Sequence, residues 1–125
     1  MKVLISACLL GLNTRYDGQS VKGDLKTQRL VKSLLKKHEV IPVCPEQLGG
    51  LPTPRPRVTI KNKKVINQSG QDVTENFLRG AQEVLKLAQL LKVKRAYFKQ
   101  HSPSCGQKGV TSKILQKHRI KIYFL

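Results

Sequence analysis

The sequence predicts a single α/β domain with three layers, in which helices cover both faces of a mostly parallel, Rossmann-like sheet. Two observations lead to this prediction. Short apolar runs alternate along the chain with stretches in which apolar residues recur at helical spacing. The length of 125 residues is typical of one domain, and no repeat or low-complexity segment divides it. We therefore expect residues 1–125 to form one unit.

The first part of the chain supplies two expected strands with a helix between them. The apolar run at residues 2–7 predicts a buried strand, and the glycines and polar residues of 8–23 predict a long loop. Leucines at helical spacing between lysines predict an amphipathic helix over residues 24–37, with Asp24 as its N-cap. Residues 40–43 are again apolar and predict the second strand.

The rest of the chain continues the alternation after an irregular segment. Closely spaced glycines and prolines exclude regular structure over residues 49–56. The segments 58–60 and 64–66 flank Asn62 and predict a small hairpin, and residues 72–91 carry the clearest helical pattern. The remaining expected elements are a strand at residues 96–98, a helix at 110–117 and a strand at 120–124.

The charge of the chain is strongly positive. It has 24 lysine and arginine residues against 7 aspartate and glutamate residues, a formal net charge of +17. Such a surface attracts phosphate, nucleotides or RNA, although a generally basic surface without a dedicated partner has the same composition. No apolar run approaches the roughly 20 residues that a membrane-spanning helix needs, so we expect no membrane partner.

Three cysteines are an odd number in a chain that shows no export signal. We therefore expect a cytoplasmic protein, and a disulfide framework is the weaker interpretation. Metal binding or thiol chemistry is the working hypothesis. The simpler alternative is that each cysteine is a small buried apolar residue, because free cysteine is among the most buried residue types.

Each cysteine follows a predicted strand. Cys8 comes directly after the first strand, Cys44 after the second, and Cys105 a few residues after the third. In open parallel sheets, ligands bind outside the carboxyl ends of the strands, so these three cysteines can meet although they are far apart in sequence. This shared position favours a metal site over three unrelated buried thiols.

Three thiolates leave one coordination position open, which suits catalysis better than a purely structural site. Both zinc and a [4Fe–4S] cluster are compatible with three soft ligands. Polar neighbours supply candidates for chemistry. Glu46 lies two residues after Cys44 and can position or deprotonate a water. Ser102 and Ser104 precede Cys105, and Arg15 and Asp17 lie on the first loop, where they are candidates for contacting a substrate.

Several motifs, in order along nearly the whole chain, resemble one family. The resemblance is carried by Ser-Ala-Cys-Leu-Leu-Gly at 6–11, Arg-Tyr-Asp-Gly at 15–18, Val-Ile-Pro-Val-Cys-Pro-Glu at 40–46, Leu-Gly-Gly-Leu-Pro-Thr-Pro-Arg at 48–55, Gly-Gln-Asp-Val-Thr at 70–74, Ser-Pro-Ser-Cys-Gly at 102–106 and Gly-Val-Thr at 109–111. The chain is similar to the family catalogued as domain of unknown function 523, whose characterised members are thiouracil desulfidases.

This resemblance implies one desulfidase-like α/β domain with a [4Fe–4S] cluster on Cys8, Cys44 and Cys105. It implies that the open iron takes the sulfur of a thiolated uracil or related thiocarbonyl compound, while Glu46 and Ser102 assist water in replacing sulfur by oxygen. Ser104, ranked below Ser102 for catalysis, is a substrate-binding candidate together with Arg15 and Asp17. The alternative is a basic RNA-binding or zinc-binding protein that uses the same three cysteines.

Overall fold

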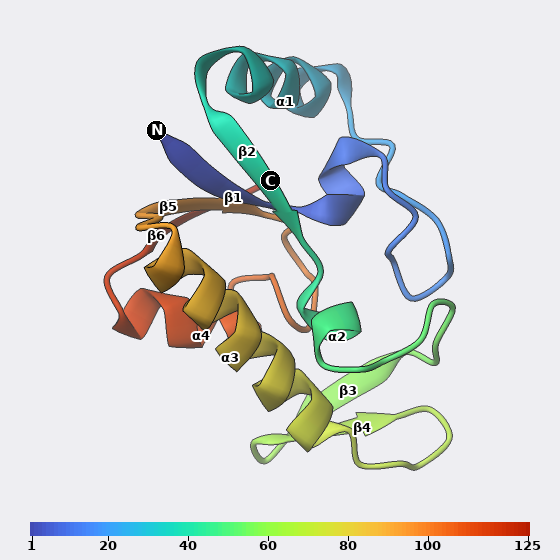
Figure 1. Cartoon of the computed structure of the whole chain (residues 1–125). Helices are drawn as coiled ribbons and strands as arrows, with labels where there is room; N and C mark the ends of the chain where they lie inside the picture. Colours follow the sequence, from blue (N-terminus) through green and yellow to red (C-terminus); the bar gives the residue numbers. More distant parts are fainter.

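The computed structural model describes residues 1–125 and consists of a four-stranded sheet with helices on both faces, plus a hairpin beside it. The sheet strands are β1 (Lys2–Ser6), β2 (Glu39–Val43), β5 (Arg95–Phe98) and β6 (Lys121–Phe124). All neighbouring strands are parallel, in the order β2-β1-β5-β6. Figure 1 shows α1 (Leu25–Lys37) over one face, and α3 (Thr74–Leu90) and α4 (Val110–Lys117) over the other. The predicted three-layer α/β fold with a mostly parallel sheet is confirmed.

Strand β1 lies at the centre because both of its faces are apolar. Val3 and Ile5 point into the core beneath α1, whereas Leu4 points into the core beneath α3 and α4, and all three are fully buried. Full burial of one such side chain contributes roughly 1.5–3 kcal/mol. From β2 on one side of β1, the chain crosses to β5 on the other side. The order of the strands therefore reverses between β1 and β5, and ligands of such sheets usually bind in the crevice at this point.

The expected helices agree closely with the structure, and α1 shows why. Its N-cap is Asp24, as predicted, and the carboxylate accepts a hydrogen bond from the backbone N–H of Thr27 at 2.8 Å. Val31 and Leu34 of α1 pack against the sheet.

None of the helices combines the length and the apolar character that a bilayer crossing requires.

The predicted hairpin is also present, as β3 (Val58–Lys61) and β4 (Lys64–Asn67) in antiparallel pairing. Asn62 and Lys63 both have positive φ, 51° and 64°, which is the backbone of a two-residue turn matched to strand twist. Val65 and Phe77 bury the hairpin against the first turns of α3.

Two short helices were not expected from the sequence. The first strand ends at Ser6, and the predicted loop begins with a 3₁₀ turn, η1 (Ala7–Leu10), that contains Cys8. The segment after Cys44 forms the one-turn helix α2 (Pro45–Leu48), which proline favours at its first position. Both turns begin where a sheet strand ends, so they set the direction of the residues that follow the sheet.

Helix α2 is fixed on α3 by two glycines. A Cβ on Gly80 would lie 1.8 Å from the carbonyl oxygen of Pro45, and one on Gly49 would lie 1.9 Å from that of Asn76. The Asn76 side chain also donates a hydrogen bond to the Gly49 carbonyl at 2.9 Å. The backbones therefore meet directly, which holds Glu46 of α2 in a defined place beside the sheet.

Candidate functional site

The three cysteines meet at one edge of the sheet, as their positions after the strands predicted. Cys8 in η1, Cys44 directly after β2 and Cys105 in the loop after β5 all line one cavity of about 400 Å³. None of them is in a disulfide. The cavity lies at the carboxyl ends of β1, β2 and β5, where the order in which the chain adds strands to the sheet reverses.

Burial disfavours the thiolate forms of Cys8 and Cys105. Burial raises the pKa of Cys8 from 9.0 to about 11, and the neighbouring Cys44 adds to the rise. Burial also raises the pKa of Cys105 to about 12, although hydrogen bonds with Ser6 and Ser104 oppose it. The protein alone thus keeps both groups as neutral thiols at neutral pH, and a bound cation is needed to stabilise the thiolates.

The three thiols line one cavity, and this arrangement bears on the kind of metal group that they can hold. No set of three histidine, cysteine, aspartate or glutamate side chains is arranged to hold a single ion. Thiolates on one tetrahedral zinc lie about 3.8 Å from each other, because each Zn–S bond is about 2.3 Å. A cubane cluster binds each thiolate through a different iron and therefore accepts a wider spacing. The three soft donors around one cavity fit such a cluster.

Glu46 is held between two donors at the wall of the same cavity. Its side chain is 11% exposed, and Arg55 Nε donates to its Oε1 at 3.0 Å. Ser104 Oγ donates to Oε2 at 2.8 Å, and Ser104 itself is buried. Each carboxylate oxygen can accept more than one hydrogen bond, so both retain capacity for a water or a substrate proton.

The two serines of the loop before Cys105 have different partners. Ser102 Oγ accepts hydrogen bonds from the backbone N–H of Cys105 at 3.1 Å and of Ser104 at 3.3 Å. It also lies 3.3 Å from Ser104 Oγ, which contacts Glu46. Ser104 is therefore the direct neighbour of the carboxylate, and Ser102 reaches Glu46 through Ser104.

The loop that carries these serines is folded tightly on itself. A Cβ on Gly106 would lie 2.7 Å from the Ser102 carbonyl oxygen, and one on Gly109 would lie 2.4 Å from that of Ser104. Ser112 Oγ donates to the Cys105 carbonyl at 2.6 Å. Contacts to backbone atoms therefore fix Cys105 relative to both serines.

Positive side chains are among the residues that line the cavity. Arg15, Arg57 and Lys99 line it, and a contact between Arg15 and a substrate stays a prediction. Asp17 does not line the cavity; its carboxylate lies 3.8 Å from Arg15 and accepts the Gln19 N–H at 3.0 Å. The structure thus places Asp17 behind Arg15, and a direct contact between Asp17 and a substrate stays a prediction.

Sequence reasoning missed Arg55, Tyr16 and Arg57 as parts of the site. Arg57 lies over the Tyr16 ring at 4.9 Å and donates to its hydroxyl, which joins the first loop to the segment before β3. Arg55 donates to the Thr14 carbonyl at 2.8 Å and joins the same two segments. The sequence did offer a signal for Arg55. It is the arginine of Pro-Thr-Pro-Arg, a proline-rich stretch only nine residues after the acidic Glu46.

The switch point of this parallel α/β sheet carries three thiols, a buried carboxylate and two serines. This combination of groups indicates a protein that carries out sulfur or metal chemistry. Comparison with known proteins shows that the chain belongs to the 2-thiouracil desulfurase family, whose sequence profile matches residues 3–123. The predicted family is thereby confirmed.

Two individual proteins illustrate the relationship. The chain superposes with a TM-score of 0.90 on a solved structure described as the [4Fe-4S]-dependent thiouracil desulfidase TudS (DUF523Vcz). The two are 37% identical, and the match covers 98% of this chain and 89% of that one. The uncharacterized protein YbbK of Bacillus subtilis (strain 168) is 32% identical, over 83% of this chain and 72% of its own length.

Proposed function

We propose that this chain is a [4Fe–4S]-dependent desulfidase that replaces the sulfur of a thiolated uracil, or of a related thiocarbonyl compound, with oxygen from water. The observation that supports this most directly is the joint position of three thiols and the held Glu46 carboxylate on one cavity. The similarity to TudS, whose description names both the cluster and the activity, supports the same assignment. The overall reaction is redox-neutral, because thiocarbonyl and water give carbonyl and hydrogen sulfide.

The ligands in this proposal are Cys8, Cys44 and Cys105. When bound on these three thiolates, the cluster supplies one iron without a protein ligand, a Lewis-acidic site for the substrate sulfur. The cavity walls then place the pyrimidine carbon beside Glu46. A buried wall of this kind also limits the number of competing waters.

Glu46 is the proposed general base. A water bound to Glu46 lies where it can attack the thiocarbonyl carbon, and a carboxylate oxygen takes its proton. Arg55 keeps the carboxylate in one orientation, so the accepting oxygen faces the cavity. Ser102 is the second catalytic candidate, and its hydroxyl is connected to Glu46 through Ser104. This chain of hydroxyls provides a path by which the proton can reach the leaving sulfur.

The proposal is tested by anaerobic reconstitution with iron and sulfide. Wild-type protein should carry about four irons and four sulfides per chain and release sulfide from 2-thiouracil. Cys44→Ser should lower the iron content, whereas Glu46→Gln should keep the iron and lose sulfide release. Wild type that is iron-free after reconstitution, or that binds only zinc, would contradict the proposal.

A nucleotide form of the thiolated pyrimidine is a second candidate substrate. Arg15, Arg57 and Lys99 of the cavity lining favour it, because guanidinium and ammonium groups bind phosphate oxygens. If it is correct, KM is lower for a thiolated nucleotide than for the free base, and Arg57→Gln removes this difference. Equal KM values for both would leave the free base as the substrate.

A further inference from the structure

A second concentration of positive charge lies at the edge of the sheet opposite the cavity. We define this basic edge as Lys92, Lys94, Arg95, Lys117, Arg119 and Lys121. After Glu83 the chain contains ten lysine and arginine residues and no aspartate or glutamate. The excess charge is therefore concentrated in the last third of the chain, and the function proposed above does not require it.

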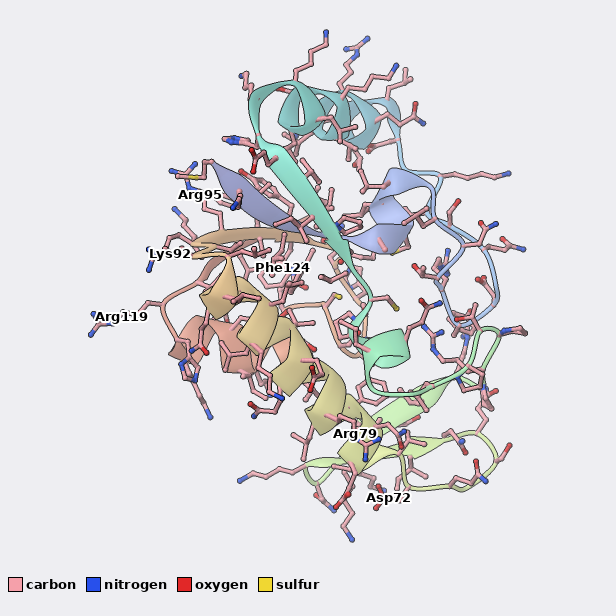
Figure 2. The ribbon with its side chains drawn as sticks, in the orientation of Figure 1. Asp72, Arg79, Lys92, Arg95, Arg119 and Phe124 are labelled. Atoms are coloured by element: carbon pink, nitrogen blue, oxygen red, sulfur yellow. The ribbon has the colours of Figure 1, made fainter.

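The parallel sheet brings these residues together. Two loops, from α3 to β5 and from α4 to β6, deliver the chain to the amino ends of two adjacent strands, and Arg95 pairs with Lys121 in the register. The backbone N–H of Lys121 donates to the Lys94 carbonyl at 3.0 Å, which joins the loops. Lys92 and Lys94 also line one shallow hollow of about 190 Å³ together with His118. Figure 2 shows Lys92, Arg95 and Arg119 reaching outward at this one side.

The cations of the basic edge have no acidic partner within the protein. Five of the six side chains are exposed and Arg95 is half-buried. The ion pairs of the structure are Arg15–Asp17, Arg55–Glu46 and Lys86–Glu83, none of which involves the basic edge. Among the first residues of the four sheet strands, the one acidic residue is Glu39 of β2, which pairs with Lys2 of β1. Glu39 therefore offsets the positive charge at the amino ends of β1 and β2, whereas the amino ends of β5 and β6 have no acidic residue.

We propose that the basic edge binds the phosphate backbone of RNA. A row of unpaired lysine and arginine side chains matches the repeating charge of a polynucleotide, and arginine and lysine supply most phosphate contacts in such complexes. A lipid surface is the less suitable partner, because membrane-binding surfaces expose apolar or aromatic anchors among their cations. Here Val93 and Ile120 of the two loops are only 3% and 5% exposed and Leu91 is half-buried, so the exposed Leu90 at the end of α3 is an isolated apolar residue rather than part of a group of anchors.

This surface is separate from the proposed catalytic cavity. The two lie at opposite ends of the strands, roughly 15 Å apart for strands of this length. The inference does not depend on the desulfidase proposal, since binding at the basic edge needs neither the thiols nor a cluster. A polynucleotide held there could extend to the cavity only by passing around the molecule.

The test compares two variants with equal loss of charge. In the edge variant, Lys92, Lys94 and Arg119 are each replaced by Gln. In the control variant, the exposed Lys26, Arg29 and Lys32 of α1 are replaced by Gln. Binding of bulk tRNA is measured by fluorescence anisotropy over a range of salt concentrations, and circular dichroism verifies the fold of both variants.

We expect the edge variant to lose affinity by roughly 100-fold at about 0.1 M salt, because each lost phosphate contact removes about 0.7 from the slope of log K against log salt. The slope itself should fall by about 2, while the control variant stays near wild type. Equal losses in both variants would show that only net charge matters and would overturn the proposal. Wild type that binds phosphatidylserine vesicles but not tRNA would overturn it as well.

Sulfide release from 2-thiouracil by the reconstituted edge variant provides a separate readout, and we expect its rate to equal that of wild type.

Discussion

Arg55 provides the sharpest test of how the site is held together. Its side chain is 5% exposed and donates to Glu46 Oε1 at 3.0 Å, to the Thr14 carbonyl at 2.8 Å, to Thr53 Oγ1 at 2.8 Å and to the Pro52 carbonyl at 3.2 Å. One guanidinium thus connects the carboxylate of α2 with two loops. Replacing it by Met keeps an unbranched side chain as far as the position of Nε and removes every one of these donors.

The expected loss of stability follows from the charge that is left behind. Glu46 is 11% exposed, so Arg55→Met leaves a nearly buried carboxylate with Ser104 as its remaining side-chain donor. Removing one partner of a buried ion pair costs about 3–5 kcal/mol. We therefore expect the free energy of unfolding to fall by about that amount at neutral pH. Adding Glu46→Gln should restore part of it, because the neutral amide does not need a cation.

Urea unfolding of the reduced, metal-free protein measures this effect, since it separates the fold from cluster loading. The matched control is Arg57→Met, which removes a guanidinium whose side-chain partner is Tyr16 at the exposed rim. We expect less than about 1 kcal/mol from that control, as for other exposed charged pairs. If Arg55→Met costs no more than Arg57→Met, or if the double variant loses the sum of both single effects, the carboxylate does not depend on Arg55 and the reasoning is wrong.

Three further predictions concern other parts of the molecule. Gly80→Ala should lower the free energy of unfolding by about 1–3 kcal/mol in urea, because the added Cβ meets the backbone carbonyl of Pro45, and an unchanged or stabilised variant would disprove that contact. Hydrogen bonds from Thr27 lower the pKa of Asp24, so its capping contribution is present above its ordinary pKa and is lost as pH falls through the folded value. The difference in Tm between wild type and Asp24→Ala should therefore shrink in acid, and a difference independent of pH would contradict the cap. In the reduced, metal-free protein, iodoacetamide should modify Cys105 roughly 1,000-fold more slowly than a free thiol at about pH 8, because burial raises its pKa from 9.0 to about 12 and lowers the fraction of thiolate accordingly. Mass spectrometry follows this reaction, and modification at the free-thiol rate would show that Cys105 is not buried.

The fold was predictable from the sequence because its signals are local. The apolar run of β1, the cap at Asp24 and the helical spacing before Leu91 each depend on residues close together in the chain. The convergence of the cysteines followed from one further rule, that parallel strands present their carboxyl ends at the same edge. The structure confirms both steps.

The finer parts of the site depend on contacts between distant segments. Ser102 and Ser104 are equivalent in sequence, and only the tertiary position of Glu46 makes Ser104 its direct neighbour. The turn of α2 forms because Gly80 allows α3 to approach, which nothing near Cys44 indicates. Arg55 likewise acquires its role through Thr14, which lies 41 residues away. Sequence patterns could name the candidate residues but not how they pair.

The central position of β1 has a consequence for how the protein is made. Cys8 and Cys44, which directly follow the ends of β1 and β2, leave the ribosome early, whereas β5, the other neighbour of β1, is synthesised about 50 residues after β2. Until β5 and the Cys105 loop emerge, one side of β1 has no partner and the third thiol is missing. A nascent chain therefore offers only two of the three thiols, and the complete cavity exists only after synthesis of the last third of the protein. Loading of any metal group that needs all three thiols must then follow synthesis of Cys105, so such a group cannot organise β1 and β2 before that point.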